Sequence, residues 1–471
     1  MTEPQTGEIP LRTYRFLKRL AWVVIRVFYR RVDVVGGERL EGRRPQLLII
    51  NHTNNFADPV LVLGMLPGLP RFLAASSWWK SRAVRWVFSL GGVVPIHRSR
   101  DGGGTAANAK TFAACHEALE HGAHLAMFPE GEVHTGPSIL PLKTGAARIA
   151  LGAAAEAGVR GVEVVPVGIV YEARDRFRSQ CAIHVGEPVL VDEWVERYRA
   201  DSRQAVRELT AELGARLRAV TVNHESWDDA NRVEEVATIA SAAPEAAPDR
   251  YARYNDLRRA LADGIARVGG WSGDRGQAIA AAVEAYNDKL LELGLDHQDV
   301  AELPTAVDRK RRRTAVEVAV LAPPAAIGVV TNAPAVALTG LAGRVVANKP
   351  TWKATIMGIT GLFLFPLTWS AIAYRLRHRG WKTVTAVYVV GPVGGLSWIA
   401  WRARWREYRR LGRIERVGDG RRAELRIVEE QRTVVAGEVR ALLVETELVS
   451  TVDLTVVVPA DPGQPASAST T

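Results

Sequence analysis

Three uncharged, mostly apolar runs in the last third of the chain restrict its fold more than any other feature. They lie at residues 318–343, 354–374 and 383–401 and contain 26, 21 and 19 residues. A helix of about 20 apolar residues spans the hydrocarbon core of a bilayer. Tryptophans flank the last two runs, as is typical of the membrane interface. We therefore predict transmembrane helices at about 354–374 and 383–401.

The first run differs because it contains Pro323, Pro324 and Pro334, each of which removes a backbone donor. We predict a re-entrant hairpin at about 318–343 that turns at "TNAP", within a membrane region at 309–410. The flanking basic residues then number 14 on one side and four on the other. Because basic residues gather on the cytoplasmic side, both the N-terminal half and the C-terminal end are expected there.

The composition narrows the choice of partners. The 471 residues carry a formal net charge of +10, which favours an acidic partner: nucleic acid, anionic lipid or a phosphorylated substrate. The two cysteines, Cys115 and Cys181, are too few for a disulfide framework or a cysteine-based zinc site and favour a reducing compartment. Several histidines occur between residues 116 and 134, but they form no clear set of ligands, so no metal is expected.

The N-terminal segment, 1–34, alternates arginines with large apolar residues in "LRTYRFLKRLAWVVIRVFYRR". This pattern predicts a basic amphipathic helix in the surface of a membrane. The alternative is a helix that docks on the protein's own core. The arginines also interrupt any apolar segment of the kind found in cleaved signal peptides.

The remaining sequence divides by composition. Short apolar runs alternate with alanine-rich helical stretches over 35–222, which predicts an α/β domain with a mostly parallel sheet. An acidic, proline-marked linker and several helices are expected over 223–308. The segment 411–471 is expected to be a charged helix followed by a disordered Pro/Ser/Thr tail from about 459.

The stretch "LIINHTNNFADPV" places His52 directly after a buried apolar run and Asp58 one turn of chain later. Loops that follow the strands of α/β sheets carry functional residues. A carboxylate that accepts from one imidazole nitrogen leaves the other free to act as a general base. By itself this spacing arises often by chance, and a surface histidine would be the more common explanation.

Three further segments accompany it. "GGVVPIHR" delivers Arg98, "MFPEGEVHTGPSILPLKTGAARIAL" contains Glu130, Gly131 and Lys143, and "VVPVGIVYEARDRFRS" ends near Arg178. Read singly, these are an edge strand with solvated arginines, a common Pro-x-Gly turn, and a hairpin. A lysine near a helix N-terminus, however, favours an anion.

Together, these four blocks closely resemble the motif blocks of the glycerolphosphate and lysophosphatidate acyltransferases, over about residues 35–195. Most of that family has four residues between the histidine and the aspartate, whereas this chain has five. The five-residue spacing, with "LPLK", "FRS", "GEP" and, more weakly, "YNDKLLELGLDHQDV", is similar to the fungal-type glycerol-3-phosphate and dihydroxyacetone-phosphate acyltransferases.

The resemblance implies that His52 and Asp58 form a catalytic dyad for acyl transfer, without a cofactor. It implies that an acyl thioester, on coenzyme A or acyl carrier protein, is the donor, and that a phosphorylated glycerol is the acceptor. Arg98, Lys143 and Arg178 would bind phosphate, Glu130 would help to bind the acceptor, and Gly131 would permit a close approach of the backbone. The expected location is a bacterial cytoplasmic membrane, with the catalytic domain facing the cytoplasm.

Two alternatives are open. A lysophosphatidate acyltransferase shares every catalytic residue, and a noncatalytic basic protein could hold membrane phosphates or nucleic acid. The complete dyad and the Pro-Glu-Gly turn argue against the noncatalytic reading, and no nucleic-acid-binding signature appears.

Overall fold

The computed structural model describes residues 11–42, 44–80, 82–96, 105–241, 249–300, 307–346, 350–418 and 422–457. The chain forms two compact units. The first comprises Met1–Ala230 and Glu245–Asn255, and the second comprises Asn231–Pro244 and Asp256–Thr471. The predicted disordered tail lies outside the described residues.

The first unit contains an eight-stranded sheet in the order β1-β7-β6-β2-β5-β3-β4, with β8 also paired to β6. All pairs are parallel except β6/β7 and β6/β8, so the predicted mostly parallel α/β fold is confirmed. The strands are β1 (Arg31–Val35), β2 (Gln46–Ile50), β3 (Arg71–Ala75), β4 (Val94–Ile96), β5 (His124–Met127), β6 (Glu163–Tyr171), β7 (Gln180–Val185) and β8 (Val189–Leu190).

Both faces of this sheet are covered, which explains why β2 is apolar throughout. Leu47 and Ile49 face one core, which also contains residues of α4, α5 and α7. Leu48 and Ile50 face the other, together with residues of α1 and α2. Successive side chains of a strand point to opposite faces, so a doubly covered strand needs a continuous apolar run. The helices of this unit are α1 (Leu11–Phe28), α2 (Ala57–Met65), α3 (Arg82–Leu90), α4 (Thr105–Glu120), α5 (Gly145–Ala155), α6 (Val195–Ala200) and α7 (Ser202–Ala219).

Helix α1 has two different apolar faces. Tyr14, Ala21 and Ile25 are buried in the first unit. Lys18 donates to the carbonyl oxygens of Leu66 and Gly68, just beyond the end of α2. Another set of large side chains stays exposed: Phe16, Leu20, Trp22, Val23 and Val27. The buried face of α1 therefore docks on the protein's own core, as the alternative reading expects. The membrane-surface prediction concerns the exposed apolar face.

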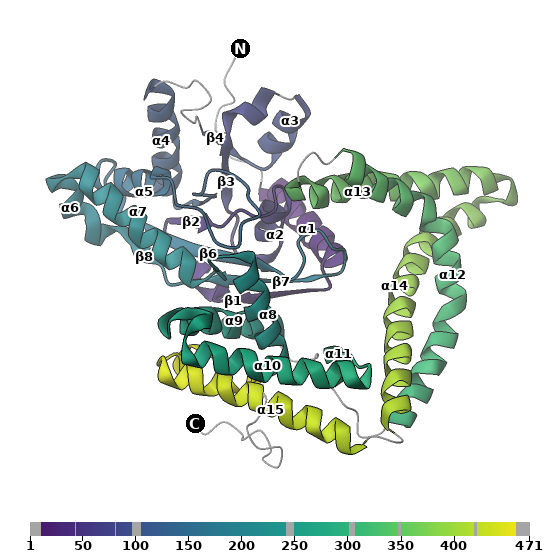
Figure 1. Cartoon of the computed structure of the whole chain (residues 1–471). Helices are drawn as coiled ribbons and strands as arrows, with labels where there is room; N and C mark the ends of the chain where they lie inside the picture. Colours follow the sequence, from purple (N-terminus) through teal and green to yellow (C-terminus); the bar gives the residue numbers. More distant parts are fainter. Residues whose placement is uncertain are drawn as a thin grey trace. The chain divides into compact units, whose positions relative to one another are not determined.

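The remaining helices are α8 (Trp227–Ala240), α9 (Arg250–Arg267), α10 (Asp274–Leu293), α11 (His297–Val300), α12 (Val307–Val345), α13 (Pro350–Leu376), α14 (Trp381–Gly418) and α15 (Arg422–Glu445). The predicted linker is therefore partly helical, because α8 occupies its centre and buries Val233 and Val236. Three helices, α12, α13 and α14, are long and apolar enough to cross a membrane (Figure 1).

The structure differs from the predicted hairpin at 318–343, because α12 is one helix of 39 residues with its three prolines inside it. Asn332, which the prediction placed in a turn, instead bonds to neighbouring helices. Its Nδ2 donates to the Gly391 carbonyl oxygen of α14 at 3.0 Å, and its Oδ1 accepts from Trp369 Nε1 of α13 at 3.0 Å. Contacts with neighbouring helices therefore override the local preference for a turn.

The two ends of this apolar region belong to the same body. Ion pairs join Arg311 to Glu415 and Lys310 to Glu407, so the beginning of α12 lies beside the end of α14. Helix α10, which precedes the region, packs against α15, which follows it, and Arg275 bonds to both Glu438 and Glu445. The segments before and after the three apolar helices are thus parts of one assembly.

Candidate active site

The residues of the candidate site lie after three neighbouring parallel strands, β5, β2 and β6. The carboxyl ends of parallel strands meet at one edge of the sheet, so the loops that follow them converge. Asn51 fastens two of these loops together. Its side chain donates to the Ile169 carbonyl oxygen at 3.0 Å and accepts from the Ile169 amide at 2.7 Å.

His52 and Asp58 are in direct contact, as the sequence predicts. His52 Nδ1 lies 2.9 Å from Asp58 Oδ2. The same oxygen accepts from the amides of Thr53 and Asn54 at 2.9 and 2.8 Å. Asp58 is completely buried in the first turn of α2, where the helix dipole favours a negative charge. The carboxylate therefore has one fixed orientation.

These contacts set the tautomer of His52. An ionised carboxylate only accepts hydrogen bonds, so Nδ1 carries the proton and Nε2 has a free lone pair. No hydrogen bond to Nε2 occurs among the residues that the structure describes. The ring stacks on Phe128 with 3.9 Å between centroids, and the side chain is 16% exposed. This arrangement suits a general base that a substrate hydroxyl can reach.

Tyr171 hydrogen-bonds to the second oxygen of Asp58. It ends β6, and its hydroxyl donates to Asp58 Oδ1 at 2.6 Å. Burial raises the pKa of Tyr171 well above its usual value, and the nearby charge of Asp58 raises it further. The phenol therefore stays protonated and donates at every working pH. Together with Thr53, Asn54 and His52, it occupies both oxygens of the carboxylate.

Replacing Tyr171 by phenylalanine is expected to lower kcat about 10- to 100-fold, because a hydrogen bond to a charged group contributes about 1.5–3 kcal/mol. Steady-state kinetics measure the loss. The matched control is Tyr198→Phe, which removes another tyrosine–carboxylate bond, to Glu156. Wild-type kinetics in Tyr171→Phe would contradict this role.

Glu130 lies against the same loop, and its contacts are all internal. Its Oε1 accepts from the His52 amide at 2.7 Å, and its Oε2 accepts from the Leu140 amide at 2.7 Å. His134 Nε2 also donates to Oε2 at 2.6 Å, because His134 Nδ1 accepts from the Gly136 amide. The carboxylate of Glu130 is buried, so in this structure it braces the main chain of His52.

Gly131 and Lys143 lie together after β5. Gly131 has φ +78°, and a Cβ atom there would lie 3.3 Å from Lys143 Cγ. The Lys143 amide donates to the Pro129 carbonyl oxygen at 2.8 Å. Glycine at this position therefore permits both the left-handed backbone and the passage of the lysine side chain.

Two predicted site residues remain, Arg98 and Arg178. Arg98 lies outside the described residues. Arg178 contacts the end of α1: its amide donates to the Phe28 carbonyl oxygen at 2.6 Å, and its Nη1 donates to the Arg26 carbonyl oxygen at 3.2 Å. Burial lowers the pKa of Arg178, and the charge of Arg30 lowers it further. Its hydrogen bonds thus join it to α1 and to no residue of the dyad.

The structure adds residues that sequence reasoning missed. Tyr171, His134 and Arg174 all contact the loops of the site. Tyr171 ends β6, and His134 and Arg174 follow strands at the same edge of the sheet as His52, so that position was the available signal. Which of the arginines after β6 faces the site depends on the path of the loop, which the sequence does not specify.

An aromatic cluster lies at the start of α2, two residues before Asp58. Phe56 contacts Trp78 and Phe88 at centroid distances of 6.0 and 6.1 Å, and Phe88 contacts Trp79 at 5.0 Å. The tryptophans belong to the short helix η2 (Ser76–Lys80), and Phe88 belongs to α3. This cluster provides apolar surface beside the dyad.

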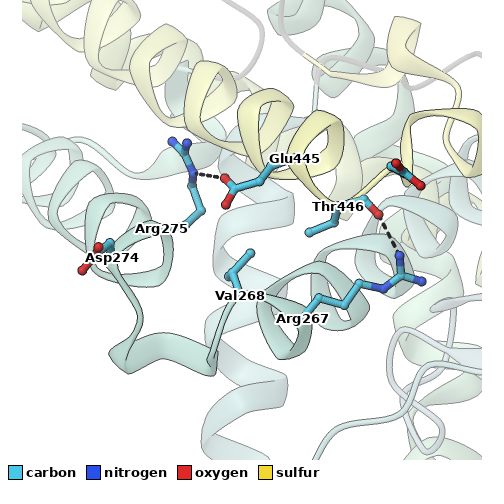
Figure 2. Close-up of a pocket in the computed structure, with 7 residues that line it drawn as sticks. Arg267, Val268, Asp274, Arg275, Glu445 and Thr446 are labelled. Carbon is cyan, nitrogen blue, oxygen red and sulfur yellow. Dashed lines mark hydrogen bonds and ion pairs between the residues drawn. The ribbon is translucent and has the colours of Figure 1, made fainter.

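The described part of the chain contains no group of three or more metal-ligating side chains. A hollow of about 580 Å³ occurs in the second unit, where Arg267 and Arg275 face Glu445 and Thr446 (Figure 2). Arg275 already pairs with Glu445, and Arg267 donates to the Thr446 carbonyl oxygen. This hollow is therefore a polar seam between α9, α10 and α15, and the candidate site is the dyad.

Comparison with known proteins finds a match over the segment that contains the dyad. The acyltransferase family model matches residues 31–170. Glycerol-3-phosphate O-acyltransferase 2 of Saccharomyces cerevisiae is 31% identical over 199 residues, which are 42% of this chain and 26% of that protein. Glycerol-3-phosphate O-acyltransferase 1 of the same yeast is 32% identical over 139 residues, 28% of this chain and 18% of that protein.

Among solved structures, the 1-acyl-sn-glycerophosphate acyltransferase of Thermotoga maritima matches 44% of this chain and 80% of its own, with 21% identity and a TM-score of 0.31. That score is too low to support a structural argument. The chain spans about a quarter or less of the length of the two yeast relatives. The matched segment contains β1 to β5, β6 except its last residue, and both dyad residues. Residues 31–170, which hold His52 and Asp58, therefore match the acyltransferase family.

Proposed function

We propose that the protein transfers a fatty acyl group from an acyl thioester, acyl-CoA, to a hydroxyl of glycerol-3-phosphate, in phospholipid biosynthesis. The observation that carries this proposal is the free Nε2 of His52, held in that tautomer by a buried and fully bonded Asp58. The yeast relatives named as glycerol-3-phosphate acyltransferases support the choice of acceptor. We take 35–222 as the catalytic domain.

In the proposed reaction, His52 Nε2 takes the proton of the acceptor hydroxyl while its oxygen attacks the thioester carbonyl carbon. Asp58 stabilises the imidazolium that forms. The C–S bond then breaks, an oxygen ester remains, and the imidazolium returns the proton to the leaving thiolate. A positioned base contributes about 10²- to 10⁴-fold in rate, and the rest comes from holding both substrates in place.

The direct test supplies purified protein with acyl-CoA and, in separate reactions, glycerol-3-phosphate, dihydroxyacetone phosphate and lysophosphatidate. Mass spectrometry identifies the products. We expect monoacylated glycerol-3-phosphate to form fastest. Transfer to lysophosphatidate alone would replace the proposed acceptor, and thioester hydrolysis without any ester product would contradict acyl transfer.

We further propose that the chain is an integral membrane protein with its catalytic domain facing the cytoplasm. The packing of α10 on α15, together with the ion pairs at the ends of α12 and α14, supports an even number of crossings. Three single crossings would place α10 and α15 on opposite sides of the membrane. Two of the three apolar helices therefore cross. We propose that these are α12 and α14, because their apolar parts pair side by side, Gly328 against Gly394 and Asn332 against Gly391, so that neither crosses without the other. The predicted pair at 354–374 and 383–401 would leave α12 outside the membrane while its partner α14 spans it.

The basic residues support this orientation. The segments before α12 and after the apolar part of α14 contain five and six of them, at 309–313 and 402–413. The connections at 344–353 and 375–382 contain three and four, and in the proposed arrangement both lie on the far side. The positive-inside rule then places the catalytic domain and the C-terminal end in the cytoplasm. The exposed apolar face of α1 suits a helix in the membrane surface.

Single-cysteine labelling tests this topology. In intact cells, a probe that cannot cross the membrane is expected to label a cysteine at His378 and also one at Asn348. Cys115 and Cys181 are buried, so they give little background. A cysteine at the exposed Ser202 is the matched control, labelled only after permeabilisation. Labelling at 378 without labelling at 348 would show that α13 and α14 cross instead, and labelling at 348 without labelling at 378 would show that α12 and α13 cross.

A further inference from the structure

Arg174 lies in the loop after β6, between Tyr171 and the arginine that sequence reasoning selected. We propose that Arg174, rather than Arg178, binds the phosphate of the acceptor. This inference rests on the proposed function, because it concerns how that site recognises its acceptor. Three observations support it: the contacts of the Arg174 guanidinium, the absence of a carboxylate partner among the described residues, and the position of its anchoring residues next to His52.

The guanidinium of Arg174 joins the loops that follow the two neighbouring strands. Its Nη1 donates to the Thr53 carbonyl oxygen after β2 at 3.3 Å and to the His134 carbonyl oxygen after β5 at 3.4 Å. Its own main chain is fixed as well. The Arg174 carbonyl oxygen accepts from Asn54 Nδ2 at 3.0 Å and from the Tyr29 hydroxyl at 3.4 Å. The cation is thus held in place at both ends of its side chain.

The partners of Arg174 are carbonyl oxygens, which leave its positive charge uncompensated. Within the described residues, no carboxylate forms an ion pair with it. Arg176, two positions along the same loop, pairs with Glu172, and Arg39 and Arg44 pair with Glu187 and Glu163. A guanidinium with one nitrogen anchored retains donors that suit phosphate oxygens.

The anchors of Arg174 also place it beside the base. Thr53 follows His52 directly, and the His134 amide donates to the His52 carbonyl oxygen at 3.3 Å. An acceptor with its hydroxyl at His52 Nε2 carries its phosphate only a few bonds away. Lys143, which lies over Gly131 on the loop after β5, is a second cation on these same loops. The carboxyl ends of parallel strands are where α/β folds bind phosphates.

Kinetics of loop variants test the inference. Arg174→Ala is expected to raise the KM for glycerol-3-phosphate about 10- to 100-fold, as for the loss of a charged hydrogen bond, and to change the KM for acyl-CoA less than about twofold. Arg174→Lys should recover part of the loss. Arg176→Ala, in the same loop, is the matched control and should leave both constants unchanged. Arg178→Ala should leave the acceptor KM unchanged too.

A second readout keeps the test independent of turnover. Inorganic phosphate should raise the melting temperature of the wild-type protein and of Arg176→Ala. It should not raise the melting temperature of Arg174→Ala, which retains Arg178. A lower kcat in Arg174→Ala with an unchanged acceptor KM and an unchanged phosphate effect would overturn the inference and leave Arg174 as a positioning residue. If the wild type acylates no phosphorylated glycerol, the proposed function fails instead, and the phosphate measurement still decides the role of Arg174.

Discussion

Replacing His52 by alanine is expected to lower kcat at least about 1000-fold while the protein still inserts in the membrane. The variant loses the group that we propose takes the acceptor proton, and a positioned base contributes up to about 10⁴-fold. Asp58→Asn should have a similar effect, because a neutral amide cannot stabilise the imidazolium that forms on His52 as a carboxylate does. Initial rates with acyl-CoA and glycerol-3-phosphate measure the loss.

The control for this experiment is His121→Ala, which removes an exposed histidine at the end of α4. It should retain normal turnover and normal membrane insertion. Because Asp58 is buried and fully bonded, Asp58→Asn also tests folding, whereas the partly exposed ring of His52 tests catalysis alone. A purified His52→Ala protein with near-normal turnover would exclude the proposed mechanism.

Replacing Gly328 by leucine is expected to disrupt the packing of α12 on α14. A Cβ atom at Gly328 would lie 1.9 Å from the Gly394 carbonyl oxygen, and backbone cannot move aside as a flexible side chain can. Overpacking of a core costs about 1–3 kcal/mol, and a clash with backbone belongs at or above the upper end of that range. Thermal unfolding and protease resistance in detergent measure the effect.

Gly340 provides the matched control, since it lies in the same helix and a Cβ atom there meets nothing within 4 Å. Gly340→Leu should unfold at or near the wild-type temperature. Equal stability of the two variants would show that the close approach of α12 and α14 does not occur in the protein.

The sequence predicts the dyad well because its geometry is local. His52 and Asp58 are six positions apart, and the turn between them begins with Asn54, whose carbonyl oxygen accepts from the amides of Ala57 and Asp58. The apolar run before His52 also identifies a strand with both faces covered. The mostly parallel sheet follows from the same alternation of strands and helices.

The contacts of Arg174 and Arg178 could not be predicted in this way. Both arginines occupy one short loop, and their roles depend on which way the chain turns after β6. Arg178 has φ +63°, an uncommon backbone conformation for a residue other than glycine, and it turns toward α1. The predicted hairpin at 318–343 was wrong for a related reason, since Asn332 finds partners on α13 and α14 that no local pattern reveals.

The packing of α10 on α15 has a consequence for biosynthesis. Helix α10 ends at Leu293 and its partner α15 begins at Arg422, so the ribosome must synthesise all three apolar helices before α10 can be covered. Helix α10 buries Ile279, Val283 and Tyr286 in the finished protein, and the face of α10 that packs on α15 stays uncovered until α15 is made. Long-range contacts of this kind form slowly and leave apolar surface open to aggregation. A nascent chain that stops within the membrane region thus lacks α15. Its α10 stays partly uncovered and is open to chaperones and proteases.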